Sequence, residues 1–96
     1  MEFNDATLRD VEADANFDGG MSKGIANTFR KRMQQIRSAL DERDFYALKS
    51  LRFEKLEGKR QHQRSMRLND QWRLIIEITG EAPKKRILVI SVEDYH

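Results

Sequence analysis

The sequence predicts an α+β domain in which two helices come first and a twisted antiparallel β-sheet follows. Apolar residues in the first half recur at helical spacing, and after residue 50 they alternate with a period of two. Glycine and proline turn signals separate the later segments. Helices followed by consecutive short strands are typical of α+β proteins, with the helices on one face of the sheet. At 96 residues the chain fits a single domain, residues 1–96.

The first twenty residues predict a short strand and a first helix. The strand is "MEF", and Asn4 or Asp5 can cap the helix after it. Gly19 and Gly20 in "FDGG" favour the positive φ of a helix stop. The inward face of this helix is predicted from three residues at helical spacing: Leu8, Val11 and Ala15.

A longer helix is predicted from Ser22 to Asp41. Its apolar stripe is predicted to be core, since a surface helix needs such a face, and comprises Ile25, Phe29, Met33, Ile36 and Leu40. The opposite face is basic, with Arg30, Lys31, Arg32 and Arg37. A short turn or helix in "ERDFYALKS" is expected to point Phe45 and Leu48 inward.

Four segments after residue 50 are predicted to be strands: "LRFEKL", "RSMRL", "QWRLIIEIT" and "KRILVISVED". The last is apolar on both faces, as a central strand would be. Gly80 and Pro83 mark the turn before it. Alternation in the third segment separates a core face of Trp72, Leu74, Ile76 and Ile78 from an opposite face of Arg73, Ile75 and Glu77.

The hairpin "SMRLNDQWRL" allows a choice between two registers. A two-residue turn at Asn69-Asp70 would mix apolar and charged residues on both faces. A three-residue loop that includes Gln71 keeps the apolar residues together, and register follows the buried pattern. The preferred pairs are Leu68 with Trp72, Met66 with Leu74, and Arg67 with Arg73.

This register places two like charges opposite each other on the face away from the helices. Opposed like charges destabilise a sheet, by about 1 to 3 kcal/mol at a separation near 5 Å. An anion between Arg67 and Arg73 would reverse that sign, and guanidinium groups fit phosphate bidentately. The alternative is that both arginines splay into water or pair with Glu77 or Glu54.

The amino-acid composition excludes some classes of catalysis and suggests a class of binding partner. The chain has no cysteine and two histidines, so thiol catalysis is excluded and neither a metal nor a cofactor is expected. No apolar run approaches a membrane span, and we expect a cytoplasmic protein. The net charge is +2, but residues 1–20 hold six acids against one arginine, whereas residues 21–96 hold seventeen basic residues against ten acids. Such a basic region suggests a polyanion, most often nucleic acid.

The chain ends in "VEDYH", which supplies groups for cleaving an RNA phosphodiester. The 2′-OH needs a base, the leaving 5′-oxygen needs an acid, and the phosphorus needs cations. Asp94 or neutral His96 can be the base, and charged His96 or Tyr95 can be the acid. The alternative is that these residues form a solvated tail, as chain ends usually do.

Three motifs in order, "LRFEKLEGKR", "SMRLNDQWRLIIEI" and the terminal "VEDYH", resemble the HigB-type toxins (plasmid maintenance killer proteins) of the RelE/ParE superfamily. The resemblance covers about residues 22–96 and is strongest after Leu51. It implies a RelE/ParE-like sheet with two N-terminal helices. It also implies metal-free cleavage of messenger RNA in the ribosomal A site, which inhibits translation.

The resemblance also implies partners and site residues. The partners would be a HigA-like helix-turn-helix antitoxin, the ribosome with its mRNA, and operator DNA through the antitoxin. The implied catalytic residues are Arg73, Asp94, Tyr95 and His96, and the RNA-phosphate ligands are Arg67, Lys55, Lys59 and Arg60.

One departure from the family pattern concerns charge. Many members read Leu-Lys-Gly where this chain has Glu57 between Leu56 and Gly58, which reverses a charge. Lys55 or Lys59 can compensate. Two other classes of function stay open: a ParE-like toxin that acts on DNA gyrase without cleaving RNA, and a non-toxic basic nucleic-acid-binding module.

Overall fold

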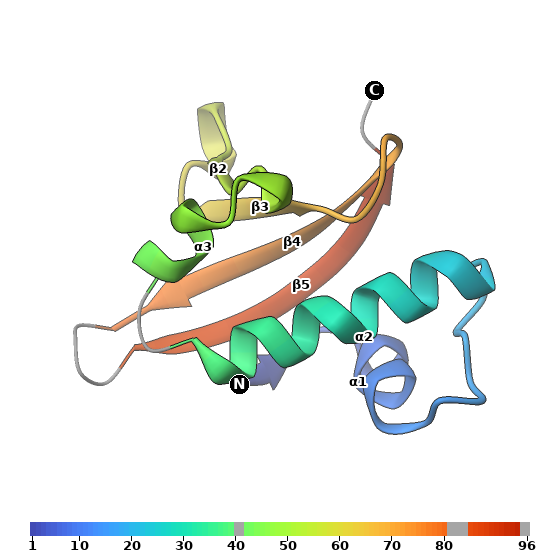
Figure 1. Cartoon of the computed structure of the whole chain (residues 1–96). Coiled ribbons are helices and arrows are strands. Elements are labelled where there is room, and N and C mark those ends of the chain that lie inside the picture. Colours follow the sequence, from blue (N-terminus) through green and yellow to red (C-terminus); the bar gives the residue numbers. More distant parts are fainter. Residues whose placement is uncertain (40–41, 81–84, 95–96) are drawn as a thin grey trace.

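The computed structural model describes residues 1–39, 42–80 and 85–94. In these residues a sheet of five strands, in the order β1-β5-β4-β3-β2, carries α1 and α2 on one face (Figure 1). The predicted α+β class is confirmed. The elements are β1 (Glu2–Phe3), α1 (Ala6–Ala13), α2 (Lys23–Ser38), α3 (Arg43–Ala47), η1 (Lys49–Leu51), β2 (Glu54–Lys55), η2 (Gly58–Arg60), β3 (Gln63–Arg67), β4 (Trp72–Thr79) and β5 (Arg86–Asp94), where η denotes a 3-10 helix.

The sheet is mixed rather than wholly antiparallel. β2, β3, β4 and β5 pair antiparallel, as predicted. The N-terminal strand β1 joins the edge of β5 in parallel, and the N–H of Asn4 donates to the carbonyl of Val89 at 2.8 Å. The chain start is therefore anchored beside the strand that ends near the candidate catalytic residues.

The hairpin between β3 and β4 has the predicted register. Met66 pairs with Leu74 and Arg67 pairs with Arg73. The Leu68 N–H donates to the Trp72 carbonyl at 2.9 Å, which closes the predicted three-residue loop. The Asn69 side chain accepts hydrogen bonds from the backbone N–H groups of Gln71 and Trp72, both at 2.8 Å, and so holds the loop in shape.

A capping side chain precedes each of the two helices, and Asp5 is one of the two caps predicted for α1. The Asp5 carboxylate accepts from the Thr7 N–H at 2.8 Å, and the Ser22 hydroxyl accepts from the Ile25 N–H at 3.2 Å. The stripe of α2 is buried from Ile25 to Ile36. α2 ends at Ser38, earlier than predicted, and the predicted stripe residue Leu40 and helix end Asp41 lie outside the described residues. α1 ends at Ala13, so the prediction that Ala15 faces the core is wrong, because that residue is exposed.

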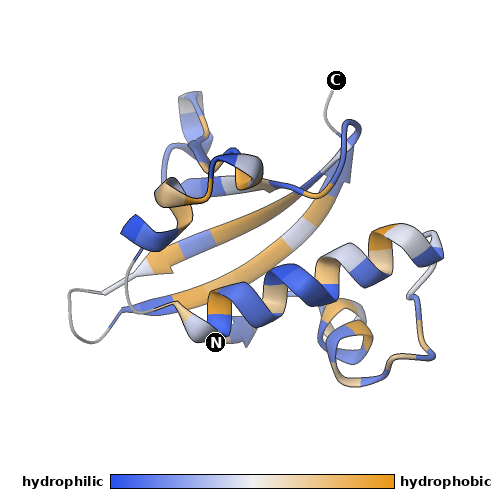
Figure 2. Ribbon diagram, in the orientation of Figure 1, coloured by the Kyte–Doolittle hydropathy of each residue, from blue (hydrophilic) through white to orange (hydrophobic). Residues whose placement is uncertain are grey.

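Two arginines of the basic face of α2 tie the helices together. Arg30 donates to the carbonyls of Val11, Asp14 and Phe17 at 2.8, 3.0 and 2.7 Å. Arg37 forms two hydrogen bonds of 2.6 Å with Glu12. Figure 2 shows the polar outer side of α2 and the apolar runs along β4 and β5.

The segment before β3 departs most from expectation. Only Glu54 and Lys55 form a strand, because η1 and a left-handed Arg52 (φ 45°) interrupt "LRFEKL". Leu51 and Phe53 are buried as the alternation predicted. The prediction for Leu48 is wrong, since this residue is 44% exposed at the end of α3. In the part of the chain described, no helix is long and apolar enough to cross a bilayer.

Candidate active site

The candidate site lies on the face of the sheet opposite the core. The core cluster takes Leu74 and Ile76 from β4, so the alternation turns Arg73 and Ile75 to the other face. The register then aligns one residue from each of three neighbouring strands: Arg67 of β3, Arg73 of β4 and Glu93 of β5. The sequence-predicted arginine pair therefore has an acidic neighbour on its far side.

Arg73 is buried, with 5% of its surface exposed, and its guanidinium group is fixed by hydrogen bonds. Its Nε donates to the Ser65 hydroxyl at 3.0 Å, and one Nη donates to the Arg52 carbonyl at 2.5 Å. The Glu54 carboxylate lies 4.0 Å away, which partly realises the alternative pairing. A charged group that is held in this way has a small reorganisation energy when it binds an anion.

The position of Arg73 depends on an unusual backbone conformation. Arg52 has φ 45°, a left-handed conformation that costs free energy for a residue other than glycine. This turn follows η1 and is closed by the Arg52 N–H, which donates to the Lys49 carbonyl at 3.1 Å. It turns the Arg52 carbonyl toward Arg73.

Two hollows share Arg73. The first, here called the terminal groove, has a volume of about 210 Å³ and is lined by Leu56, Arg60, Ser65, Arg73, Ile75, Glu93 and Asp94. The second, the loop pocket, has a volume of about 130 Å³ and is lined by Arg52, Arg67, Asn69, Asp70 and Arg73.

An ion pair lies across the terminal groove. Arg60 donates two hydrogen bonds to the Glu93 carboxylate, at 2.9 and 2.7 Å, and its Nε donates to Gln63 at 2.8 Å. The hydrogen bond from Arg60 lowers the pKa of Glu93, burial opposes this, and the Ser91 hydroxyl lowers it further. The same pairing raises the pKa of Arg60. Glu93 was not among the predicted site residues, although its alternation with Val92 places it on the Arg73 face.

Arg67 lies in a strongly positive neighbourhood. Its guanidinium pairs with Asp70 of the hairpin loop, and its carbonyl accepts from Arg32 Nε at 3.0 Å. Burial and then the charge of Arg67 lower the pKa of Arg32. Arg67 thus pairs within its own loop rather than with Glu77 or Glu54, the acids considered from the sequence.

The predicted lysines lie beside the terminal groove. Lys55 lines a shallow depression of about 390 Å³ together with Glu57, so the residue that reverses the family charge and its proposed substitute lie together. Lys59 is exposed on η2, next to Arg60. Of the four predicted phosphate ligands, Arg60 lines the terminal groove and Arg67 lines the loop pocket.

The chain end reaches the site at Asp94. This residue lines the terminal groove, but it pairs with Trp72, a residue of the core face, and its carboxylate accepts a hydrogen bond from Gln71 at 3.1 Å. Tyr95 and His96, also predicted to be catalytic, lie outside the described residues. Among the described residues, no three His, Cys, Asp or Glu side chains cluster as metal ligands would.

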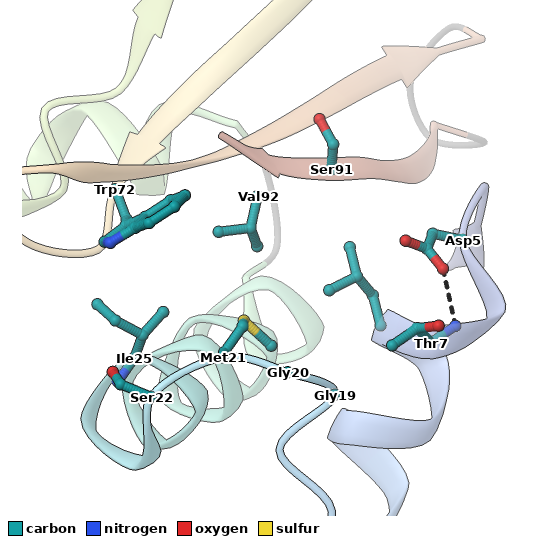
Figure 3. A pocket seen from close by; sticks show the side chains of 11 residues that line it. Asp5, Thr7, Gly19, Gly20, Met21, Ser22, Ile25, Trp72, Ser91 and Val92 are labelled. Carbon is teal, nitrogen blue, oxygen red and sulfur yellow. Dashed lines mark hydrogen bonds between the residues drawn. The ribbon is translucent and has the colours of Figure 1, made fainter. Parts of the chain in front are cut away.

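A separate cavity of about 360 Å³ lies on the helix side of the sheet, between the α1–α2 connection and β4–β5. Figure 3 shows Met21, Ile25, Trp72 and Val92 around it, while the Ser91 side chain points away. The Ser91 hydroxyl instead donates to Glu93 at 2.6 Å. β5 therefore contributes to both faces, and this cavity takes no part in the arginine site.

Comparisons with known proteins identify the family and the fold. Residues 1–95 match the family model described as the HigB-like RelE-like toxin of a type II toxin–antitoxin system. A solved YoeB/ParE toxin from Agrobacterium tumefaciens is 15% identical, with 100% of each chain covered and a TM-score of 0.64, which shows a shared fold. No curated protein matches the chain. The chain belongs to the HigB-like family of RelE-like toxins from type II toxin–antitoxin systems.

Proposed function

We propose that this toxin is an endoribonuclease that cleaves messenger RNA in the ribosomal A site without a metal ion. The observation that carries the proposal is the buried, hydrogen-bonded guanidinium of Arg73, which lines the same groove as Asp94. A fixed cation beside an acid–base group is what cleavage of a phosphodiester needs.

In this proposal Arg73 stabilises the charge that develops on the phosphorus oxygens. Because two acceptors already hold its guanidinium, the group is oriented before the RNA arrives. Arg67, Arg60, Lys55 and Lys59 hold the RNA backbone. Glu57 weakens this contact at one point, while Lys55 in the same depression offsets its charge.

The proton transfers fall to the chain end. A base, Asp94 or neutral His96, takes the proton from the 2′-OH, and the 2′-oxygen forms a bond to phosphorus. The bond to the 5′-oxygen breaks, and an acid, charged His96 or Tyr95, protonates that oxygen. The products are a 2′,3′-cyclic phosphate and a 5′-hydroxyl.

Arg60 enters this scheme by exchanging partners. Its two hydrogen bonds now go to Glu93, and a phosphate can accept the same planar pair of donors. This exchange breaks the ion pair between Arg60 and Glu93, which is weak because both side chains are partly exposed. RNA binding would thus open the terminal groove by displacing Glu93 from Arg60.

A type II toxin acts with an antitoxin. We propose that this partner is a HigA-like protein with a helix-turn-helix domain, and that the pair reaches operator DNA through the antitoxin. Action on ribosome-bound mRNA places the protein in the cytoplasm.

The test uses purified protein with ribosomes programmed with a defined mRNA, and the same RNA without ribosomes. We expect 5′-hydroxyl ends within the reading frame only when ribosomes are present. Lys31→Gln, an exposed change on α2, serves as a control that keeps full cleavage. Intact mRNA together with gyrase-dependent DNA damage in cells would instead support a non-nucleolytic ParE-like toxin. Intact mRNA without toxicity would leave a nucleic-acid-binding module.

A further inference from the structure

We infer that the loop pocket is a second phosphate subsite, which holds the phosphodiester next to the scissile one. This inference rests on the proposed function, because it takes the terminal groove as the cleavage position. It adds Arg52 to the residues that contact RNA. The ligand class is single-stranded RNA, bound through its backbone and not through its bases.

Three arginines from separate parts of the chain converge on this pocket. Arg52 follows η1, Arg67 ends β3 and Arg73 lies in β4, and all three line the same volume of about 130 Å³. One acid, Asp70, lines the pocket with them, so the lining carries more positive than negative charge. The Asp70 side chain is 96% exposed on the hairpin loop, and an ion pair with such a group is weak.

The electrostatics of the pocket favour an anion. Arg67 and Arg73 are directly opposed in the sheet. Burial is the larger cause that lowers the pKa of nearby Arg32, and the positive charge of Arg67 lowers it further. Like charges on neighbouring strands repel each other. A phosphate between them would remove this repulsion, and guanidinium groups bind phosphate with paired hydrogen bonds.

The backbone of Arg52 is strained in a way that serves this pocket. Its left-handed conformation turns the carbonyl toward Arg73, and Arg52 lines the same hollow as Arg73. Strained residues of this kind are concentrated at functional sites. One backbone turn therefore holds Arg73 in place and supplies a further cation beside it.

The two hollows are placed to bind adjacent phosphates of one RNA strand. Arg73 belongs to both linings, so a phosphate in the terminal groove and its neighbour in the loop pocket would lie on either side of one guanidinium. Successive backbone phosphates suit this arrangement, whereas a single free phosphate would use one hollow. The predicted consequence is that Arg52 affects binding more than chemistry.

The test measures binding of a fluorescein-labelled single-stranded RNA to the purified toxin between 25 and 200 mM salt. Arg52→Gln is expected to weaken binding about tenfold. It is also expected to reduce the slope of log K against log salt by about 0.7, the value for one lost contact with a single strand. Arg9→Gln, an exposed arginine on α1, is the matched control and should bind as the wild type does.

A second variant separates binding from folding. Arg52→Gly removes the guanidinium but relieves the left-handed strain, so it should unfold at a higher temperature than the wild type and still bind RNA as weakly as Arg52→Gln. With programmed ribosomes, both variants should raise KM more than they lower kcat.

Two results would overturn the subsite: an Arg52→Gln protein with the wild-type salt slope, or a wild-type protein with no affinity for RNA at 25 mM salt. The proposed function is judged separately by the cleavage products. If mRNA stays intact but Arg52→Gln still lowers the slope, the subsite stands and the nuclease proposal fails. If mRNA is cut and the slope is unchanged, the nuclease proposal stands and the subsite fails.

Discussion

Arg60 and Glu93 form a two-pronged ion pair that crosses β4, with N–O distances of 2.9 and 2.7 Å. Arg60 belongs to η2, which connects β2 to β3, and Glu93 belongs to β5, so the pair links segments that lie on either side of β4. Both residues line the terminal groove.

The direction of the pKa shift of Glu93 predicts how the contribution of this pair to stability depends on pH. Arg60 lowers the pKa of Glu93 in the folded protein below its ordinary 4.5. The pair should therefore stabilise the fold above about pH 4.5, and this contribution is lost as the pH falls through the lowered pKa. A double-mutant cycle of Arg60→Gln and Glu93→Gln should give a coupling energy of at most about 1 kcal/mol at pH 7.

Urea unfolding of the four proteins of this cycle measures the coupling. It should fall toward zero as the pH drops from 7 through the lowered pKa of Glu93, and it should shrink in 1 M salt because the pair is half exposed. A coupling energy that stays constant over this pH range would contradict the assignment.

A substitution of the buried Arg73 can test separately the effects of its positive charge and of its hydrogen-bond geometry. Arg73→Lys keeps the positive charge, but one ammonium cannot reproduce the fork that reaches both Ser65 and Arg52. We expect kcat for ribosome-bound mRNA to fall about 10²- to 10³-fold. Ser65→Ala should cost less, since the Arg52 carbonyl still orients the group. Wild-type cleavage by a folded Arg73→Lys protein would show that orientation is unimportant.

Deletion of His96 should strongly reduce the rate of cleavage without unfolding the protein. Loss of an acid or base typically costs about 10²- to 10⁴-fold in rate. His62→Gln is the matched control, because that imidazole lies 3.1 Å from Glu77 and is not assigned a catalytic role. Growth arrest on induction, followed by 5′-end mapping of mRNA, measures both variants. Arrest that is equally strong without His96 would remove it from the mechanism.

Three glycines predict three different effects on stability. A Cβ at Gly19 (φ 60°) would lie 2.7 Å from Val11 Cγ2 and 2.8 Å from Thr7 Cγ2, so Gly19→Ala should lose about 1 to 3 kcal/mol. Gly20 (φ 87°) has open space, and Gly20→Ala should lose about 1 kcal/mol from backbone strain alone.

Gly24 completes this series, because it lies within α2 with open space around it. Gly24→Ala should stabilise the protein by about 0.5 to 1 kcal/mol. Urea unfolding gives all three values. If Gly19→Ala proved no more costly than Gly20→Ala, the close approach of α1 to this turn would be contradicted.

The hairpin register shows how far the sequence could predict the site. Alternation in "SMRLNDQWRL" is compatible with one register that buries Met66 and Leu74 together, and that register places Arg67 opposite Arg73. The prediction succeeded because burial on one face constrains every residue of the strand. It did not predict that Arg73 would itself be buried, since that depends on Arg52 and Ser65 reaching it.

The less predictable parts have weaker local signals. "LRFEKL" alternates like a strand, yet η1 and the turn at Arg52 leave two residues of strand. Arg30 and Arg37 look like a solvated basic face in the sequence. In the structure they bind the carbonyls near the end of α1 and the carboxylate of Glu12.

The amino-acid pattern is sufficient to predict the class of the fold, the two helices and the register of the hairpin. All of these follow from periodicity and from the burial of one face, which are local properties of the chain. The tertiary structure decided which arginines are structural and which line the groove. A guanidinium takes its role from the acceptors that distant segments bring to it, and Arg73, Arg60 and Arg30 have different acceptors.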